Sequence, residues 1–102
     1  MLNGKKILTQ ILLWISGLGI QTINLSSVTI AANGSGNSTG DISQAGKQPL
    51  GILGVAKSGG GSGDVLISAY YLTGSSAVVS LRNFASASRT ITCTVNVLYK
   101  KA

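Results

Sequence analysis

The sequence predicts an all-β protein, a small β-sandwich or jelly-roll-like domain that follows a short N-terminal helical segment. Three observations lead to this fold class. In the stretch from Thr90 to Tyr99 every second residue from Ile91 onward is apolar, apolar runs elsewhere are divided by Gly/Ser-rich turns, and the first 22 residues differ in pattern from the rest. We therefore expect an amphipathic segment over residues 1–22 and a β-sandwich domain over residues 23–102, which is a usual size for one domain.

The N-terminal segment has three open interpretations. Its apolar residues follow the three, four, three spacing of a helical bundle seam, and such a short seam needs identical neighbours or an adjoining domain: Leu8, Ile11, Ile15 and Leu18. Gly17 and Gly19 should end this helix. Lys5 and Lys6 before an apolar run also fit a secretory signal. The third interpretation is an anchor to a membrane surface or a partner, because the run is too short and too interrupted for a membrane span.

Between this segment and the last strand, the pattern predicts short strands separated by turns. The expected elements are a strand at 28–31, a flexible loop at 33–40, a short strand at 41–45, a strand at 50–56 opened by Pro49, a mobile loop at 58–63, and strands at 65–73 and 77–83 with turns at 74–75 and 85–88. The glycines within 50–56 predict β-bulges or a close approach of the backbone.

The last strand has one apolar face and one threonine-rich face. The apolar face, which we expect in the core, consists of Ile91, Cys93, Val95, Val97 and Tyr99. Cys93 is the sole cysteine, so no disulfide forms within the chain, and its position predicts a small buried hydrophobe.

The strand at 65–73 is apolar on both faces, with Val65, Ile67 and Tyr71 on one and Leu66, Tyr70 and Leu72 on the other. A sandwich of this size has no third layer, so the second face should meet another subunit. We expect a homotrimer whose interface contains Leu8, Ile11, Ile15, Leu18, Leu66, Tyr70 and Leu72.

The composition argues against an enzyme. The chain has no histidine and no glutamate, so the common hydrolytic triads and zinc sites lack their residues, and we predict no catalytic residue, metal or cofactor. The two acids, Asp41 and Asp64, lie beside glycine-rich turns and are expected to be turn formers. The net charge of +6 favours polyanionic partners.

Several stretches carry a family resemblance, namely Pro49-Leu-Gly-Ile-Leu-Gly-Val55, Leu66-Ile-Ser-Ala-Tyr70, Val79-Ser-Leu-Arg-Asn83 and the closing Ile91-Thr-Cys-Thr-Val-Asn-Val-Leu-Tyr-Lys100. With these, the region from Val28 to Lys100 resembles the C-terminal β-sandwich domains of bacteriophage tail and head fibres. The resemblance implies a trimeric structural protein of the virion that caps a stem, contacts other virion proteins and meets host surface polysaccharide. It does not separate a tail fibre from a head fibre or a capsid-decorating protein.

In such fibres the loops on the rigid scaffold are the natural contact surface, and Arg82, Asn83 and Phe84 are the residues we expect at a ligand. Two other classes stay open. One is a secreted or anchored bacterial surface domain, which depends on residues 1–20. The other is a nucleic-acid-binding β-module, which the charge favours but which the lack of interleaved basic and aromatic residues disfavours.

Overall fold

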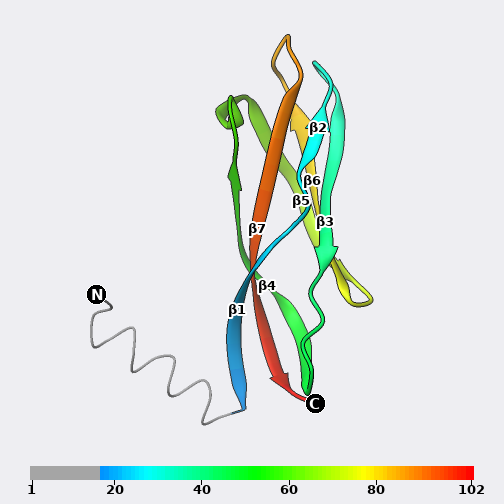
Figure 1. Ribbon diagram of the computed structural model, residues 1–102, viewed down its shortest axis with the longest axis vertical. Helices are drawn as coiled ribbons and strands as arrows, with labels where there is room; N and C mark the ends of the chain where they lie inside the picture. Colours follow the sequence, from blue (N-terminus) through cyan, green and yellow to red (C-terminus); the bar gives the residue numbers. More distant parts are fainter. Residues whose placement is uncertain (1–16) are drawn as a thin grey trace, which may run out of the picture.

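The alternating stretch near the C-terminus forms the longest strand that the structure describes. The computed structural model describes residues 17–102, and within them β7 (Arg89–Lys101) pairs along both of its edges. On one edge lies β4 (Lys47–Ser58), and on the other β1 (Leu18–Asn24) is followed by β2 (Val28–Ile30), all antiparallel. β7 is therefore the centre of the first sheet (Figure 1).

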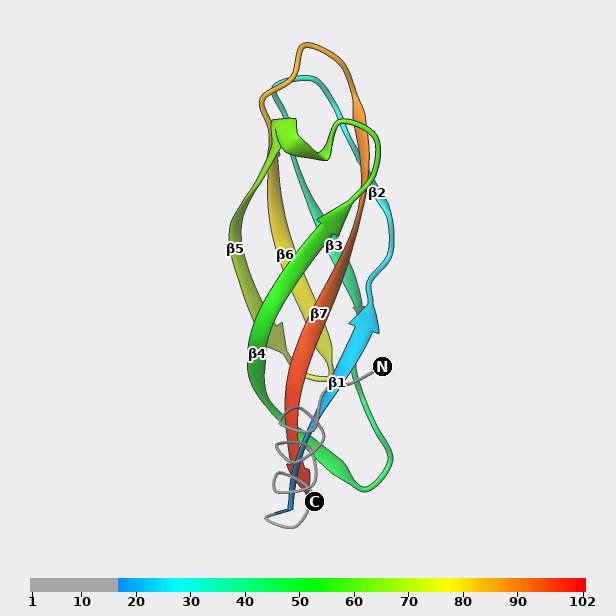
Figure 2. The same cartoon turned by 90° about the vertical axis from the view of Figure 1, so that its left-hand side faces the viewer.

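The second sheet has three strands with β6 (Ser76–Asn83) in the middle. β3 (Ser35–Asp41) pairs with one edge of β6 and β5 (Val65–Thr73) with the other, and a short 3-10 turn, η1 (Ser62–Asp64), leads into β5. The two sheets pack face to face, with β4 beside β5 at one flank and β2 beside β3 at the other (Figure 2). The predicted all-β sandwich is confirmed.

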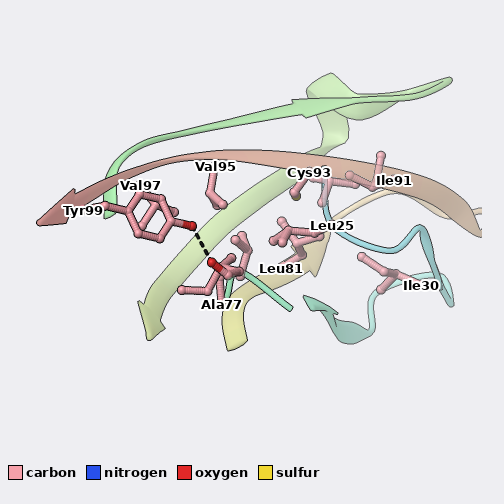
Figure 3. Close-up of a cluster of buried hydrophobic side chains, with 12 residues drawn as sticks. Leu25, Ile30, Ala77, Leu81, Ile91, Cys93, Val95, Val97 and Tyr99 are labelled. Atoms are coloured by element: carbon pink, nitrogen blue, oxygen red, sulfur yellow. Dashed lines mark hydrogen bonds between the residues drawn. The ribbon is translucent and has the colours of Figure 1, made fainter. Parts of the chain in front are cut away.

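The core lies between the sheets and takes alternate residues of β7, as the sequence predicted. Its fully buried apolar residues are Leu25, Ile30, Ile42, Val65, Ala77, Val79, Leu81, Ile91, Cys93, Val95, Val97 and Tyr99. The Tyr99 ring lies at one end of this cluster, and its hydroxyl donates a hydrogen bond to the carbonyl oxygen of Ile42 (Figure 3). That bond satisfies the one polar atom which the ring brings into the core.

The first strand corrects the expected domain boundary. Residues 18–22, assigned above to the end of a helical segment, form most of β1, so the β-domain begins no later than Leu18. Leu18 pairs with Lys100 of β7 and takes no part in a helical seam. Strand pairing prevails here because β7 offers a complete antiparallel edge to Leu18–Asn24. The rest of the predicted seam, Leu8, Ile11 and Ile15, lies outside the described residues.

β3 was predicted to be a loop, and that prediction is wrong. Its residues include no large apolar side chain, but the strand pairs with β6 and its small residues let it approach Leu25, Val28 and Ile30 closely. Buried Ser38 donates its hydroxyl to the carbonyl oxygen of Ser26 at 2.7 Å. A Cβ on Gly36 or Gly40 would lie 3.2 or 3.0 Å from neighbouring side chains, which is tighter than an ordinary contact.

The prediction of a short strand at 41–45 is also wrong, because Asp41 is the only one of these five residues that belongs to a strand. The Asp41 carboxylate accepts hydrogen bonds from the Ser43 main-chain N–H at 2.8 Å and from the Ser43 hydroxyl at 3.0 Å. These bonds favour the charged form and lower the pKa of Asp41. The residue is a turn former, as expected.

Both edge strands at the β4/β5 flank contain bulges. The register of β4 against β7 shifts at Leu50 and again at Leu53, so the bulges predicted from the neighbouring glycines are confirmed. A third shift, at Ser68 of β5, was not predicted. Each bulge leaves one extra residue outside the ladder and turns an edge strand away from regular pairing.

The bulge at Ser68 changes which residues of β5 share a face. Before it, Val65 and Ile67 lie on the core side, opposite Asn83 and Leu81 of β6. After it, Tyr70 and Leu72 lie on the core side, opposite Val79 and Ala77. The faces predicted from strict alternation are therefore wrong beyond Ser68, because one unpaired residue reverses the alternation.

Candidate functional site

An exposed apolar surface lies where β4 and β5 face one another. We call it the open flank. Exposed Tyr70 lies here with four half-buried side chains that pack against the core, Ile52, Val55, Ile67 and Leu72, and the edge strand β4 adds its two exposed bulge residues, Leu50 and Leu53. The exposed fractions of Leu50, Leu53 and Tyr70 are 47%, 56% and 50%. The core therefore reaches the surface between two edge strands that end their sheets at this flank (Figure 2). Apolar surfaces of this kind mark contacts with another molecule.

The structure separates the three β5 residues predicted to share an interface. Leu72 packs against the core, Tyr70 lies at the open flank, and Leu66 lies on the other side of β5 opposite Arg82. Leu50 and Leu53 were not predicted as surface residues, although the glycines beside them had predicted the bulges that leave them unpaired.

The outer face of the β3–β6–β5 sheet is a second exposed surface, which we call the platform. Its side chains form four rows across the strands, Ser35–Arg82–Leu66, Asn37–Ser80–Ala69, Thr39–Val78–Tyr71 and Asp41–Ser76–Thr73. β5 supplies an apolar side with Leu66 and Tyr71, while β3 supplies hydroxyl and amide groups and, in the last row, the Asp41 carboxylate. Val78 in the centre is 7% exposed, so the apolar contact area of the platform belongs mainly to β5.

The predicted ligand residues separate into an exposed pair and a buried one. The Arg82 guanidinium lies over the Phe84 ring at 5.7 Å from its centroid, and Phe84 is 59% exposed. Asn83 between them is fully buried. Arg82 and Phe84 are thus placed at one end of the platform, and Asn83 is excluded from direct contact with a ligand.

Asn83 instead joins the loops at its end of the sandwich. Its Nδ2 donates to the carbonyl oxygens of Ile30, Ala31 and Ala87 at 2.9 to 3.2 Å, and its Oδ1 accepts from the Ala85 N–H at 2.9 Å. A buried amide that satisfies four main-chain groups is a structural residue. It holds the exposed Arg82 and Phe84 on a rigid base.

The glycine-rich loop 59–63 wraps around the Arg89 side chain. Arg89 forms an ion pair with Asp64 at 3.2 Å, and Lys57 donates to the carbonyl oxygen of Ser62 at 2.7 Å. Gly61, with φ 74°, leaves room for the guanidinium, since a Cβ there would lie 2.3 Å from Arg89 Nε. The acid at this turn, Asp64, is therefore engaged by a cation from β7.

The outer face of the β1–β7–β4 sheet differs from the platform, because most of its hydroxyl-bearing side chains pair with a neighbour, with Thr94 as an exception. Thr22 donates to Asn96 at 2.6 Å, Ser27 shares a hydrogen bond with Thr92 at 2.5 Å, and Thr29 shares one with Thr90 at 2.9 Å. On the platform, the side chains of Asn37, Thr39 and Ser80 make no hydrogen bond within the described residues. Their polar groups are available to a ligand.

The core cysteine is not part of a reactive group. Cys93 is fully buried, and its burial raises the pKa of the thiol, which disfavours the nucleophilic thiolate. Across residues 17–102, no three acidic or cysteine side chains gather as a metal site would require, and no pocket is present.

The chain matches no protein-family model, and it shows no significant similarity to a curated protein sequence or to a solved structure. No helix in the described part of the chain has the length and apolar character needed to cross a membrane. The open flank and the platform are the two candidate surfaces for contact with other molecules.

Proposed function

We propose that this chain is a structural protein of a bacteriophage virion, of the fibre or capsid-decoration type, which assembles as a homotrimer and contacts host surface glycans. The observation that carries the proposal is the open flank. It exposes apolar side chains from two edge strands of one small sandwich, and a second copy of the chain is the simplest means of covering them. The resemblance of Val28–Lys100 to fibre domains supports the same assignment.

The open flank replaces the interface expected from the sequence. Leu53 and Leu66 are both 56% exposed, but Leu53 lies at the open flank and Leu66 on the platform. This equal exposure provides a matched pair of variants. We expect Leu53→Ser to weaken assembly and Leu66→Ser to leave it intact, because only the first would place a polar group in the subunit contact.

Light scattering on the purified full-length chain tests the assembly. The expected mass is three times the chain mass of 10.3 kDa, and Leu53→Ser should shift the population toward a monomer. A monomeric wild-type chain at micromolar concentration contradicts the trimer. If Leu66→Ser loses the trimer and Leu53→Ser keeps it, the subunit contact lies on the outer side of β5 and not at the open flank.

The virion assignment needs its own experiment, because cell-surface proteins also form trimers. Mass spectrometry of particles purified from the native culture should find this chain together with the major structural proteins. Recovery from the cell envelope, with none in the particles, would instead favour the secreted or anchored bacterial surface domain.

A further inference from the structure

We propose that the platform binds an extended, acidic oligosaccharide that lies along β5 and β6, with Phe84 and Tyr71 as two separate stacking positions and Arg82 as the contact for its carboxylates. This inference deepens the glycan contact proposed above and rests on it. It replaces the loop-end contact of Arg82, Asn83 and Phe84 with a surface that extends along the sheet.

The aromatic positions define the length of the ligand. Tyr71 is 49% exposed on the same sheet face as Val78 and Arg82, and Phe84 is held beside Arg82. Arg82 follows Val78 by four residue steps along β6, which is roughly 13 Å in an extended strand. A single sugar ring does not span this distance, so contact with both aromatic rings requires an oligosaccharide.

The polar groups between the two rings match the hydroxyls of a sugar chain. Asn37, Thr39 and Ser80 are adjacent to the apolar side of the platform, and within the described residues their side chains form no hydrogen bond. An amide and two hydroxyls supply both donors and acceptors, as a sugar requires. The paired hydroxyls around β7 offer no equivalent surface.

The unpaired positive charge of Arg82 favours an acidic ligand over a neutral one. Arg82 is the one basic side chain in the platform rows and has no ion-pair partner among residues 17–102. The one acidic side chain in these rows, Asp41, lies three rows away from Arg82, and Ser43 donates hydrogen bonds to its carboxylate. Asp64 is paired with Arg89. Residues 17–102 have six basic and two acidic side chains. A guanidinium already supported by an aromatic ring is a good partner for a planar carboxylate.

The adjacent tyrosines of β5 provide a matched control. Tyr70 and Tyr71 are 50% and 49% exposed, but Tyr70 lies at the open flank and Tyr71 on the platform. Threonine is suited to a strand, so Tyr70→Thr and Tyr71→Thr keep the local preference of the chain. We expect Tyr71→Thr to weaken glycan binding and to preserve the trimer, and Tyr70→Thr to do the reverse.

The test is an NMR and calorimetric titration of the full-length chain with a hexamer of galacturonic acid, a hexamer of sialic acid, and the carboxyl-reduced neutral form of the first. At least one acidic hexamer should bind and shift the amide signals of Tyr71, Val78, Arg82 and Phe84. Tyr71→Thr and Phe84→Ala should each weaken binding by about tenfold. Arg82→Gln should abolish the preference for the acidic over the neutral hexamer.

Several results overturn the inference. These are a lack of binding to all three hexamers at millimolar concentration, signal shifts confined to the β1–β7–β4 face, or equal affinity of the wild-type chain for the acidic and neutral hexamers. Tighter binding of a single-stranded oligonucleotide with the same number of charges would assign the platform to nucleic acid. If Tyr71→Thr keeps full affinity while Tyr70→Thr loses the trimer, the glycan inference fails and the assembly proposal stands.

Discussion

The hydroxyl of Tyr99 in β7 donates a hydrogen bond of 2.5 Å to the main-chain carbonyl oxygen of Ile42, and both residues are fully buried. Ile42 follows directly after β3, so this bond joins the central strand of the first sheet to the chain that leaves the second. The two sheets are therefore connected by a specific polar contact at one end of an otherwise apolar core.

Loss of this bond should destabilise the fold without altering its shape. Tyr99→Phe leaves a buried carbonyl oxygen without its phenol donor, so we expect the free energy of unfolding to fall by about 1–3 kcal/mol. Urea denaturation measures the change. Tyr71→Phe is the control, because it removes an exposed hydroxyl and should have an effect of about 0.5 kcal/mol or less. Equal stabilities for the two variants would contradict the structural role of Tyr99.

Asn83→Ala should have a larger effect, because it removes four hydrogen bonds from a fully buried position. We expect a loss of stability on the order of 3 kcal/mol, measured by thermal or urea denaturation. Arg82→Ala, at the exposed neighbouring position, should cost about 0.5 kcal/mol or less. A stable Asn83→Ala variant with weakened glycan binding would show that Asn83 contacts the ligand after all.

Among the three consecutive glycines Gly59, Gly60 and Gly61 of the β4–β5 loop, Gly60 should tolerate a side chain and the two others should not. Gly59 has φ 131°, and a Cβ there would lie 2.4 Å from the carbonyl oxygen of Thr90, while Gly61 has φ 74° and adjoins Arg89. Gly60 has open space around it. We expect Gly59→Ala and Gly61→Ala to cost about 1–3 kcal/mol each and Gly60→Ala to change stability by less than about 1 kcal/mol. Urea midpoints for the three variants distinguish these outcomes.

Stability should fall in alkaline solution. Burial is the main cause that raises the pKa of both the Cys93 thiol and the Tyr99 phenol in the folded chain, and for Tyr99 the nearby charge of Asp41 adds to it. The unfolded chain therefore loses these protons at a lower pH than the folded chain, so the free energy of unfolding decreases as pH rises. It should be constant with respect to these groups below about pH 8 and decline above it.

Cys93→Val separates the two contributions. This variant should lose the first part of the alkaline decline, between about pH 8 and pH 9.5, and retain the later part that belongs to Tyr99. Urea denaturation at a series of pH values measures both. A wild-type chain whose stability rises with pH through this range would contradict the assignment.

How far the sequence predicted the fold depended on whether alternation was interrupted. In residues 90–99 every second residue from Ile91 to Tyr99 is apolar, and this buried face was predicted residue by residue. In β5 both faces carry apolar residues, so a change of face leaves no mark in the sequence, and the bulge at Ser68 depends on how β6 pairs with the strand. β3 was missed because its residues become a strand only through the neighbours that accept their small side chains.

The residues of the candidate surfaces were likewise predicted only in part. Arg82, Asn83 and Phe84 were predicted together as ligand residues, and the structure places Arg82 and Phe84 beside one another with both exposed. Asn83 was misassigned because an amide at a strand end resembles a ligand contact, and only the surrounding loops show that it is buried. Tyr71 was assigned to the wrong side of β5 because the bulge at Ser68 reverses the faces of the strand. The platform could not be recognised from the sequence without the correct position of Tyr71.

The position of β7 in the chain has a consequence for biosynthesis. β1, β2 and β4 all pair with a strand that leaves the ribosome after they do, so the first sheet cannot assemble while translation is still upstream of Arg89. The second sheet needs only β3, β5 and β6, and its β5–β6 pair is a local hairpin. Such non-local pairing slows folding, and the unpaired strands wait as exposed edges in the nascent chain. The apolar faces of β1, β2 and β4 therefore remain without their sheet partner until β7 is synthesised.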